Sequence, residues 1–371
     1  MLLKKNGSVW ITAGKLRGRS SSGDPGDSFV QVVSSGATAM AAGIDFSIIL
    51  KSDDSVWGIG RNYKGQLGDG TRVKRETLIY VQTITGVEAV AAGGYHSMVL
   101  TRAGHVYNTG WNKYGQSGDR TTADRSRFRQ VMYTGAKAVA AGELHSIVLK
   151  QDGSVWAAGR NCNGQLGDGS KADRNSFVKV VSDSAVAVAA GGYHSMVLKE
   201  DGSVWATGWN EFGQLGDGST SDRSDYLQVS SGVKSVAAGR RHTMLLKHNG
   251  SVWGTGYNNH AQLGIRWKTA KNNVFEEVFS AGVEVIAAGA FRSMVVKQDG
   301  SIWITDSNAQ PRISNAPILT RDTFVKIEPF DNGSVHDHCM NASSLFSTIA
   351  QALPCIMLSL SLSLCGYRLH S

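Results

Sequence analysis

Short apolar runs separated by glycine-containing turns follow one another along most of this chain. One complete unit consists of four runs: VAVAAG (186–191), HSMVLK (194–199), SVWATG (203–208) and the more polar DYLQV (225–229). Asp201-Gly202 joins the second run to the third, and such a dipeptide favours a tight hairpin because the turn needs positive φ. The pattern therefore predicts four antiparallel strands per unit, with the polar run outermost.

The unit recurs seven times. Its aromatic anchor stands at these positions, spaced 47 to 50 residues apart: Trp10, Trp57, Tyr107, Trp156, Trp205, Trp253 and Trp303. Near-continuous apolar strands indicate sheets covered on both faces, and four such strands per repeat are typical of a β-propeller blade. We therefore predict an all-β, seven-bladed β-propeller of four-stranded blades over residues 1–330.

Ala-Ala-Gly triplets end the first run of six units, which indicates that backbones crowd together where the blades meet at the axis. The chain has seven SVW-type hairpins but six of these triplets, and the alanine-rich run of the first unit would belong before Met1. One blade is therefore expected to be incomplete or to be closed by the C-terminal part of the chain.

The stretch AAGGYHSMVLKEDGSVWATGWNEFGQLGDG (189–218) and its weaker copies resemble the regulator of chromosome condensation repeat family. The resemblance covers about residues 1–330 and implies the propeller fold, while propellers of this family serve unrelated tasks. The repeats at Trp10 and Trp303 depart from the pattern because they lack GQLG. By the resemblance, guanine-nucleotide exchange on a small GTPase is one alternative function. A fragment of a larger protein, such as a HECT-type ubiquitin ligase, is another.

Composition adds a bias toward acidic partners. The 371 residues carry a formal charge of +8 and a pI near 9.3, which favours acidic proteins, nucleic acid or anionic lipid. The four cysteines form no CxxC pair, so we expect a reducing compartment, the cytoplasm, with the nucleus as the alternative. The N-terminus shows no apolar signal-peptide core.

Two sets of recurring residues are interpreted as structural. Histidines at one repeat position lie on separate blades, where no carboxylate is expected to orient them as bases: His96, His145, His194 and His242. The tryptophans of the SVW runs are expected to be wedges between blades: Trp57, Trp156, Trp205 and Trp253.

The segments after GQLGDG carry uneven charge, and equivalent loops of a propeller open on one face. Residues 71–80 and 119–130 are each net +2, whereas residues 217–226 are net −2. We therefore predict a basic docking sector for an acidic protein surface, with a small GTPase or chromatin as candidates, made by these residues: Arg72, Lys74, Arg75, Arg120, Arg125, Arg127 and Arg129. The function this favours is a monomeric protein-interaction module.

No catalytic constellation is apparent. GQLGDG lacks the lysine and the following helix of a phosphate-binding loop, so it is interpreted as a turn. His336, Asp337, His338 and Cys339 have no second ligand pair, so neither a metal nor another cofactor is expected. We expect no enzyme and no small-molecule substrate.

Residues 331–371 form an atypical tail. No charged residue stands between Cys339 and Tyr367, and SLFSTIAQALPCIMLSLSLSLCG (344–366) is long enough to span a bilayer. Its serines and Pro354 weaken that interpretation. A disordered or misread segment, a strand and a membrane anchor all remain open, and a membrane is a partner only in the last case. Our preferred prediction places the tail outside the ring.

Overall fold

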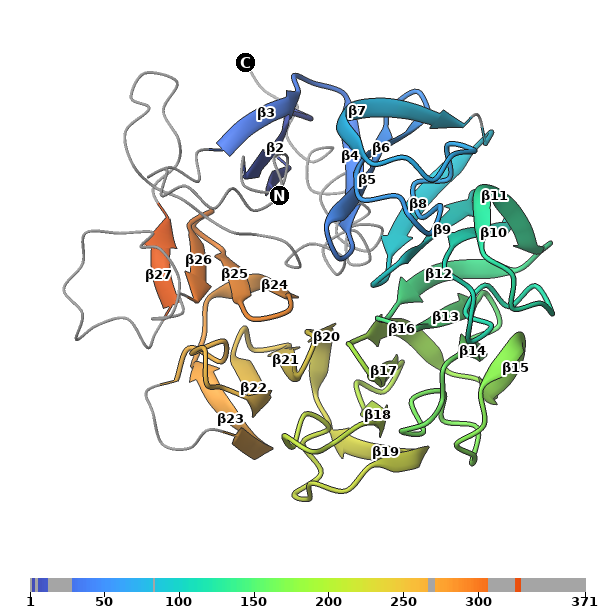
Figure 1. Ribbon diagram of the computed structural model, residues 1–371. Coiled ribbons are helices and arrows are strands. Elements are labelled where there is room, and N and C mark those ends of the chain that lie inside the picture. Colours follow the sequence, from blue (N-terminus) through green and yellow to red (C-terminus); the bar gives the residue numbers. More distant parts are fainter. Residues whose placement is uncertain are drawn as a thin grey trace, which may run out of the picture.

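The structure is a computed structural model that describes residues 2–3, 6–12, 29–82, 84–265, 271–305 and 324–327. Throughout these residues the regular elements are strands, and they form seven antiparallel sheets. The sheets stand side by side in a ring around a central axis (Figure 1). The predicted all-β propeller is therefore confirmed.

The sheets are numbered here as blades 1 to 7 in chain order. Blade 1 contains β1 (Leu2–Leu3), β2 (Val9–Thr12) and β3 (Phe29–Val33). Blade 2 contains β4 (Ala37–Ala42), β5 (Phe46–Lys51), β6 (Val56–Gly60) and β7 (Arg75–Gln82). Blade 3 contains β8 (Val87–Ala92), β9 (His96–Thr101), β10 (Val106–Gly110) and β11 (Arg125–Met132). Blade 4 contains β12 (Ala136–Ala141), β13 (His145–Lys150), β14 (Val155–Gly159) and β15 (Arg174–Val181).

The remaining blades repeat this order of strands. Blade 5 contains β16 (Ala185–Ala190), β17 (His194–Lys199), β18 (Val204–Gly208) and β19 (Arg223–Ser230). Blade 6 contains β20 (Val233–Ala238), β21 (His242–Lys247), β22 (Val252–Tyr257) and β23 (Lys271–Phe279). Blade 7 contains β24 (Val283–Ala288), β25 (Ser293–Lys297), β26 (Ile302–Thr305) and β27 (Phe324–Ile327). In blades 2 to 7 each strand pairs with the next along the chain.

The first strand of each complete blade lies at the axis, as the alanine-rich runs predicted (Figure 1). Small residues are required there because neighbouring inner turns touch. A Cβ added to Gly191 would overlap the His194 ring and lie 2.6 Å from the carbonyl oxygen of Gly239 in the next blade. Backbone hydrogen bonds join these turns from blade to blade, for example from the Glu143 amide to the Gly192 carbonyl at 3.1 Å.

Apolar side chains between adjacent blades form the core. One cluster combines Ile147 and Leu149 of blade 4 with Val188 and Val197 of blade 5, and Trp205 packs against it. Another joins blade 1 to blade 2 and includes residues of blade 7. The core is thus distributed around the ring, which explains why every repeat keeps the same apolar runs.

Blade 1 shows three strands in the described residues, with β2 between β1 and β3. They correspond to the second, third and outermost strands of the other blades, so the prediction of one incomplete blade agrees with this part of the chain. The predicted outer strand of the last repeat is present as β27, paired with β26. Residues 328–371 lie outside the described residues, and the domain boundary and the fate of the tail stay predictions.

Candidate docking face

Two kinds of loop, described in blades 2 to 6, lie at one end of each blade and together form what we call the loop face. In blade 7 the turn between the first and second strands belongs to it. The turn between the first and second strands lies there, and so does the longer connection between the third and fourth strands, because neighbouring strands run in opposite directions. In blade 5 the two loops touch, since the Trp209 amide donates to the Tyr193 carbonyl at 2.8 Å. The loop face therefore gathers the variable segments that follow GQLGDG.

The N-x-x-G-Q-L-G-D connection is held by its own polar side chains. In blade 5 the Asn210 Oδ1 atom accepts from the Leu215 amide at 3.0 Å, and its Nδ2 group donates to Asp217 Oδ1 at 3.0 Å. Arg223 Nη2 lies 2.8 Å from Asp217 Oδ2, and this carboxylate is almost fully buried. The same acid–base pair recurs in blades 2, 3 and 4, so the motif is a structural turn, as the sequence indicated.

This recurring pair includes two of the seven basic residues predicted to bind a partner. Arg75 Nη2 lies 2.6 Å from Asp69 Oδ2, and Arg125 Nη2 lies 2.8 Å from Asp119 Oδ2. Burial tends to raise the pKa of Asp69, but hydrogen bonds from Thr71 and Arg75 prevail and leave it below its ordinary value. Arg75 and Arg125 therefore have a structural task that a charge count along the sequence does not reveal.

Of the other basic residues, Arg72 and Arg127 lie at the boundary between blades 2 and 3. Arg120 lies at the next boundary, where its amide donates to the Asn175 carbonyl of blade 4 at 2.7 Å. The loop of blade 2 pairs with β11 of blade 3 through a bridge between Asp69 and Arg127, and the Gly70 amide donates to the Ser126 carbonyl at 2.7 Å. The side chain of Arg72 is 55% exposed and lies 3.9 Å from Asp124. That of Arg129 is 56% exposed and lies 3.9 Å from Asp119.

Lys74 lies 3.4 Å from Glu76, while Arg120 and Arg127 are exposed. Val73 stands between Arg72 and Lys74 and is 60% exposed. The structure therefore brings Arg72 of one basic segment and Arg127 of the other to one boundary, with the apolar Val73 beside Arg72. We call Arg72, Lys74, Arg120, Arg127 and Arg129 the basic sector.

The recurring histidines are fully buried at the boundaries between blades. His145 Nε2 of blade 4 lies 2.9 Å from Ser195 Oγ of blade 5, and Ser195 Oγ donates to the Gln165 carbonyl of blade 4 at 2.6 Å. Because the single hydroxyl proton is used on that carbonyl, the serine accepts and His145 carries its proton on Nε2. His96, His194 and His242 make the equivalent contact to Ser146, Thr243 and Ser293.

Protonation of these rings is opposed by their surroundings. The Nδ1 atom of each is buried without a hydrogen-bond partner, so a second proton would create an unpaired buried charge. Burial lowers the pKa of His96 and His194 to about 4, and burial with nearby histidines lowers those of His145 and His242 to about 3. These contacts fit neutral structural residues, as the sequence pattern predicted.

The SVW tryptophans are half-buried wedges capped by lysine. Trp205 of blade 5 packs against the cluster shared with blade 4, its Nε1 group donates to Ser203 Oγ at 3.0 Å, and Lys199 Nζ lies 4.8 Å from its ring centre. Trp57, Trp156 and Trp253 have the same serine and lysine partners. Their contacts are those of packing residues, although each keeps one part of its surface in water.

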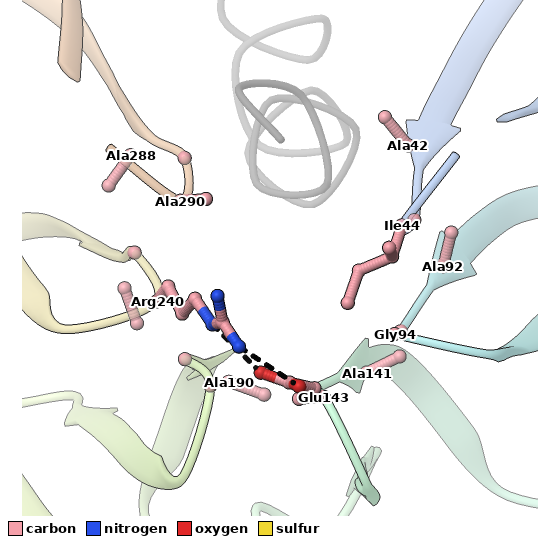
Figure 2. A pocket seen from close by; sticks show the side chains of 18 residues that line it. Ala42, Ile44, Ala92, Gly94, Ala141, Glu143, Ala190, Arg240, Ala288 and Ala290 are labelled. Atoms are coloured by element: carbon pink, nitrogen blue, oxygen red, sulfur yellow. Dashed lines mark hydrogen bonds and ion pairs between the residues drawn. The ribbon is translucent and has the colours of Figure 1, made fainter. Parts of the chain in front are cut away.

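A cavity on the axis opens at the inner turns and is lined mainly by alanine and glycine (Figure 2). Glu143 of blade 4 and Arg240 of blade 6 point toward each other across blade 5, with Arg240 Nε 3.0 Å from Glu143 Oε2. They are the ionisable side chains among the described lining residues, and they neutralise each other. Burial, followed by the Glu143 charge, raises the pKa of neighbouring Tyr193 to about 12.

Sequence reasoning missed a row of aromatic side chains on the loop face. They occupy three positions per blade: before the histidine, directly after the third strand, and three residues further on. A comparison of these positions between repeats could have found them, because some blades place arginine or leucine there.

The described part of the chain offers neither a metal site nor a membrane-spanning helix. It contains no cluster of three or more His, Cys, Asp or Glu side chains able to hold a metal ion. Nor does it contain a helix of the length and hydropathy that a membrane span requires. The predicted non-ligands His336 to Cys339 lie outside the described residues.

Comparisons with known proteins identify relatives of the repeat. A family model of the RCC1-like domain matches residues 1–230, and a model of the regulator of chromosome condensation (RCC1) repeat matches residues 233–262. No curated protein matches the sequence.

Solved structures share the architecture at low identity. Human WBSCR16 is 20% identical with a TM-score of 0.73, and the match covers 87% of this chain and 93% of that one. Yeast RCC1 (Prp20) bound to Kap60 is 20% identical with a TM-score of 0.65, covering 73% and 70%. A second structure of Prp20p from Saccharomyces cerevisiae is 20% identical with a TM-score of 0.66, covering 79% and 77%.

Proposed function

This chain belongs to the family of RCC1-like domains, and we propose that it is a protein-interaction propeller that docks an acidic partner on the basic sector of its loop face. The observation that carries the proposal is the meeting of two basic segments at the boundary of blades 2 and 3. The five cations of the basic sector, of which Lys74 is half-exposed and the others are exposed, offer charge together with apolar contact from Val73. Rim charges of this kind steer partners and add specificity.

The family supports a binding role. The structures of Prp20 are described with Kap60, and with binding to Gsp1p and histones. A protein partner for this chain is consistent with those relatives, while the chemistry of the partner follows from the residues of the basic sector.

The test compares two variants with equal changes of charge. One is Arg72→Glu/Arg127→Glu/Arg129→Glu on the basic sector, and the control is Lys137→Glu/Lys179→Glu/Lys234→Glu, at exposed positions on other parts of the blades. Arg75 and Arg125 stay unchanged because each pairs with a buried carboxylate. Partners captured by the wild type are quantified by mass spectrometry, and binding is repeated with the purified candidate.

We expect the wild type and the control to bind the same candidate, and the basic-sector variant to lose it without a change in melting temperature. Raised salt should weaken the wild-type complex, because exposed charges are screened beyond about 8–10 Å. If all three proteins bind equally and salt has no effect, docking on the basic sector is wrong.

Nucleotide exchange is the second candidate, favoured by the Prp20 relatives. Its assay is the release of a fluorescent GDP analogue from purified small GTPases in the presence of the full chain. If the full chain accelerates GDP release and the basic-sector variant does not, the basic sector is an exchange surface. If the chain accelerates GDP release from none of the small GTPases tested, nucleotide exchange is contradicted and docking on the basic sector stays as proposed.

A further inference from the structure

Half-buried rings form a nearly continuous arc on the loop face, from blade 3 to blade 7. In blade 3, Trp111 lies edge-on to Tyr95 and to Tyr114, with ring centres 5.4 and 5.6 Å apart. In blade 5, Trp209 makes the same contacts with Tyr193 at 5.8 Å and Phe212 at 5.2 Å. The two groups occupy equivalent positions of their repeats.

The arc continues into blades 6 and 7. Phe212 lies 4.8 Å from Tyr257, and Tyr257 lies 5.8 Å from His260. His260 in turn lies 5.0 Å from Phe291, whose surface is 38% exposed. We call the whole series, from Tyr95 in blade 3 to Phe291 in blade 7, the aromatic arc.

Two arginines join the parts of the arc. The Arg160 guanidinium of blade 4 lies 5.1 Å from the Tyr114 ring and 5.6 Å from the Tyr193 ring, which links blades 3 and 5. The Arg241 guanidinium lies 5.2 to 5.6 Å from three rings of blades 5 and 6. Neither arginine is paired with a carboxylate in the described part of the chain, and Arg241 Nε is buried without a hydrogen-bond partner.

Folding of a blade does not require aromatic residues at these positions. Blade 2 places Asp45, Arg61 and Lys64 where blade 3 places Tyr95, Trp111 and Tyr114, and it forms the same four-stranded sheet. In both blades the residue after the third strand donates its amide to the turn before the second strand, at 2.7 Å for Arg61 and 2.9 Å for Trp111. The backbone is thus the same, and the aromatic side chains are additional.

Trp, Tyr and Arg are the residue types that dominate the binding energy of protein interfaces. A guanidinium on an aromatic platform without a carboxylate partner is oriented for an anion, and the rings beside it offer apolar contact. We propose that the aromatic arc binds an acidic peptide segment that also carries aromatic side chains. This inference rests on the proposed role in protein binding but assigns a second surface.

A peptide fits the arc better than single-stranded nucleic acid does. The rings meet edge to face, so neighbouring edges cover part of the ring faces on which bases would stack. Glu211 is exposed on the loop face, where it would repel a row of phosphates. Carboxylates spaced along a peptide can instead meet Arg160 and Arg241 and avoid Glu211.

The probe is a fluorescein-labelled random copolymer of glutamate and tyrosine, titrated with the full chain at physiological salt and followed by anisotropy. Poly-glutamate of equal length measures the contribution of charge alone. We expect Arg160→Gln/Arg241→Gln to weaken binding of the copolymer by at least about 30-fold, since both charge-assisted contacts are lost. The control, Lys137→Gln/Lys234→Gln, removes the same charge at exposed sites outside the arc and should change binding less than about twofold.

A second variant should leave the backbone of blade 3 unchanged. Trp111→Arg copies the residue found at this position in blades 2 and 4, and it should lower the preference for the glutamate–tyrosine copolymer over poly-glutamate. An unchanged preference, or equal losses in the arginine variant and the lysine control, would overturn the inference. Tighter binding of oligo(dT) than of the copolymer would overturn it too.

The variant Arg72→Gln/Arg127→Gln/Arg129→Gln separates this inference from the proposed function. If it loses the copolymer while the arc variant keeps it, the arc is not the site and the basic sector stands. If only the arc variant loses the copolymer, the arc stands without the basic sector.

Discussion

Acid should weaken this propeller through its four buried histidines, and a variant that lacks one of them should lose less stability in acid than the wild type. His194→Phe is the informative change because blade 2 already carries Phe46 at this position. Phe46 lies against Gly43 as His194 lies against Gly191. In blade 3, which follows blade 2, the Ser97 hydroxyl still donates to the Gln66 carbonyl at 2.7 Å, although blade 2 carries Phe46 in place of a histidine.

The magnitude follows from the pKa of His194, which burial lowers from 6.5 to about 4. The unfolded chain therefore binds a proton at pH values where the folded chain does not, so stability is complete above pH 6.5 and falls as the pH drops toward 4. At pH 5 the loss is about 2 kcal/mol, since each pH unit below 6.5 costs about 1.4 kcal/mol.

The variant loses the contact between His194 Nε2 and Thr243 Oγ1, 3.0 Å in the wild type. At pH 7.5 this should make it less stable than the wild type by about 0.5–1.5 kcal/mol. At pH 5 the order should reverse, because the variant has no ring to protonate in the unfolded state. The two stability curves should therefore cross between these pH values.

The assay is urea unfolding followed by tryptophan fluorescence at pH values from 7.5 to 5. His248→Gln, at an exposed hairpin position, is the control and should run parallel to the wild type. If the difference between His194→Phe and the wild type is the same at every pH, protonation of His194 does not couple to folding. Such a result would contradict a lowered pKa for the buried His194 ring.

Two further changes test the packing and the recurring ion pair. Trp205→Ala should lower stability by about 2–3 kcal/mol, less than for a fully buried tryptophan because the ring is half-buried between blades 4 and 5; an unchanged unfolding midpoint would contradict the wedge role. Arg75→Gln should cost about 1–2 kcal/mol because Asp69, 4% exposed, loses its cation. Arg72→Gln, measured alongside, should stay within about 0.5 kcal/mol, and equal costs for both would contradict the distinction drawn between them.

Much of the fold could be predicted from the repeat. The hairpin dipeptides and the alanine-rich runs each involve neighbouring residues of one chain segment. Together with the spacing of the SVW anchors, they specify the strands and the order of the strands in each sheet. The polar run at 225–229 lies within the outer strand β19, as expected. The structural interpretation of His145 followed from its recurrence, whereas its hydroxyl partner Ser195 lies 50 residues away and could not be identified.

The basic sector shows where a charge count is insufficient. Seven cations were predicted to face a partner, yet Arg75 and Arg125 bind buried carboxylates that precede them by six residues. The sequence contains that spacing in four repeats, so comparing repeats with one another would have separated these two from the rest. Whether the remaining five bind a partner stays a prediction.

The sequence by itself determined the repeating unit, the strands and the residues that must be small at the axis, because hairpins and apolar periodicity are local. Only the tertiary structure decided which residues of different blades meet. The aromatic arc exists because the circular arrangement of the blades brings aromatic side chains from different repeats side by side. Glu143 and Arg240 pair across blade 5, where a Cβ on Gly192 would lie 3.1 Å from Arg240 Cγ. Contacts of this kind depend on closure of the whole ring, and no short segment of the chain encodes them.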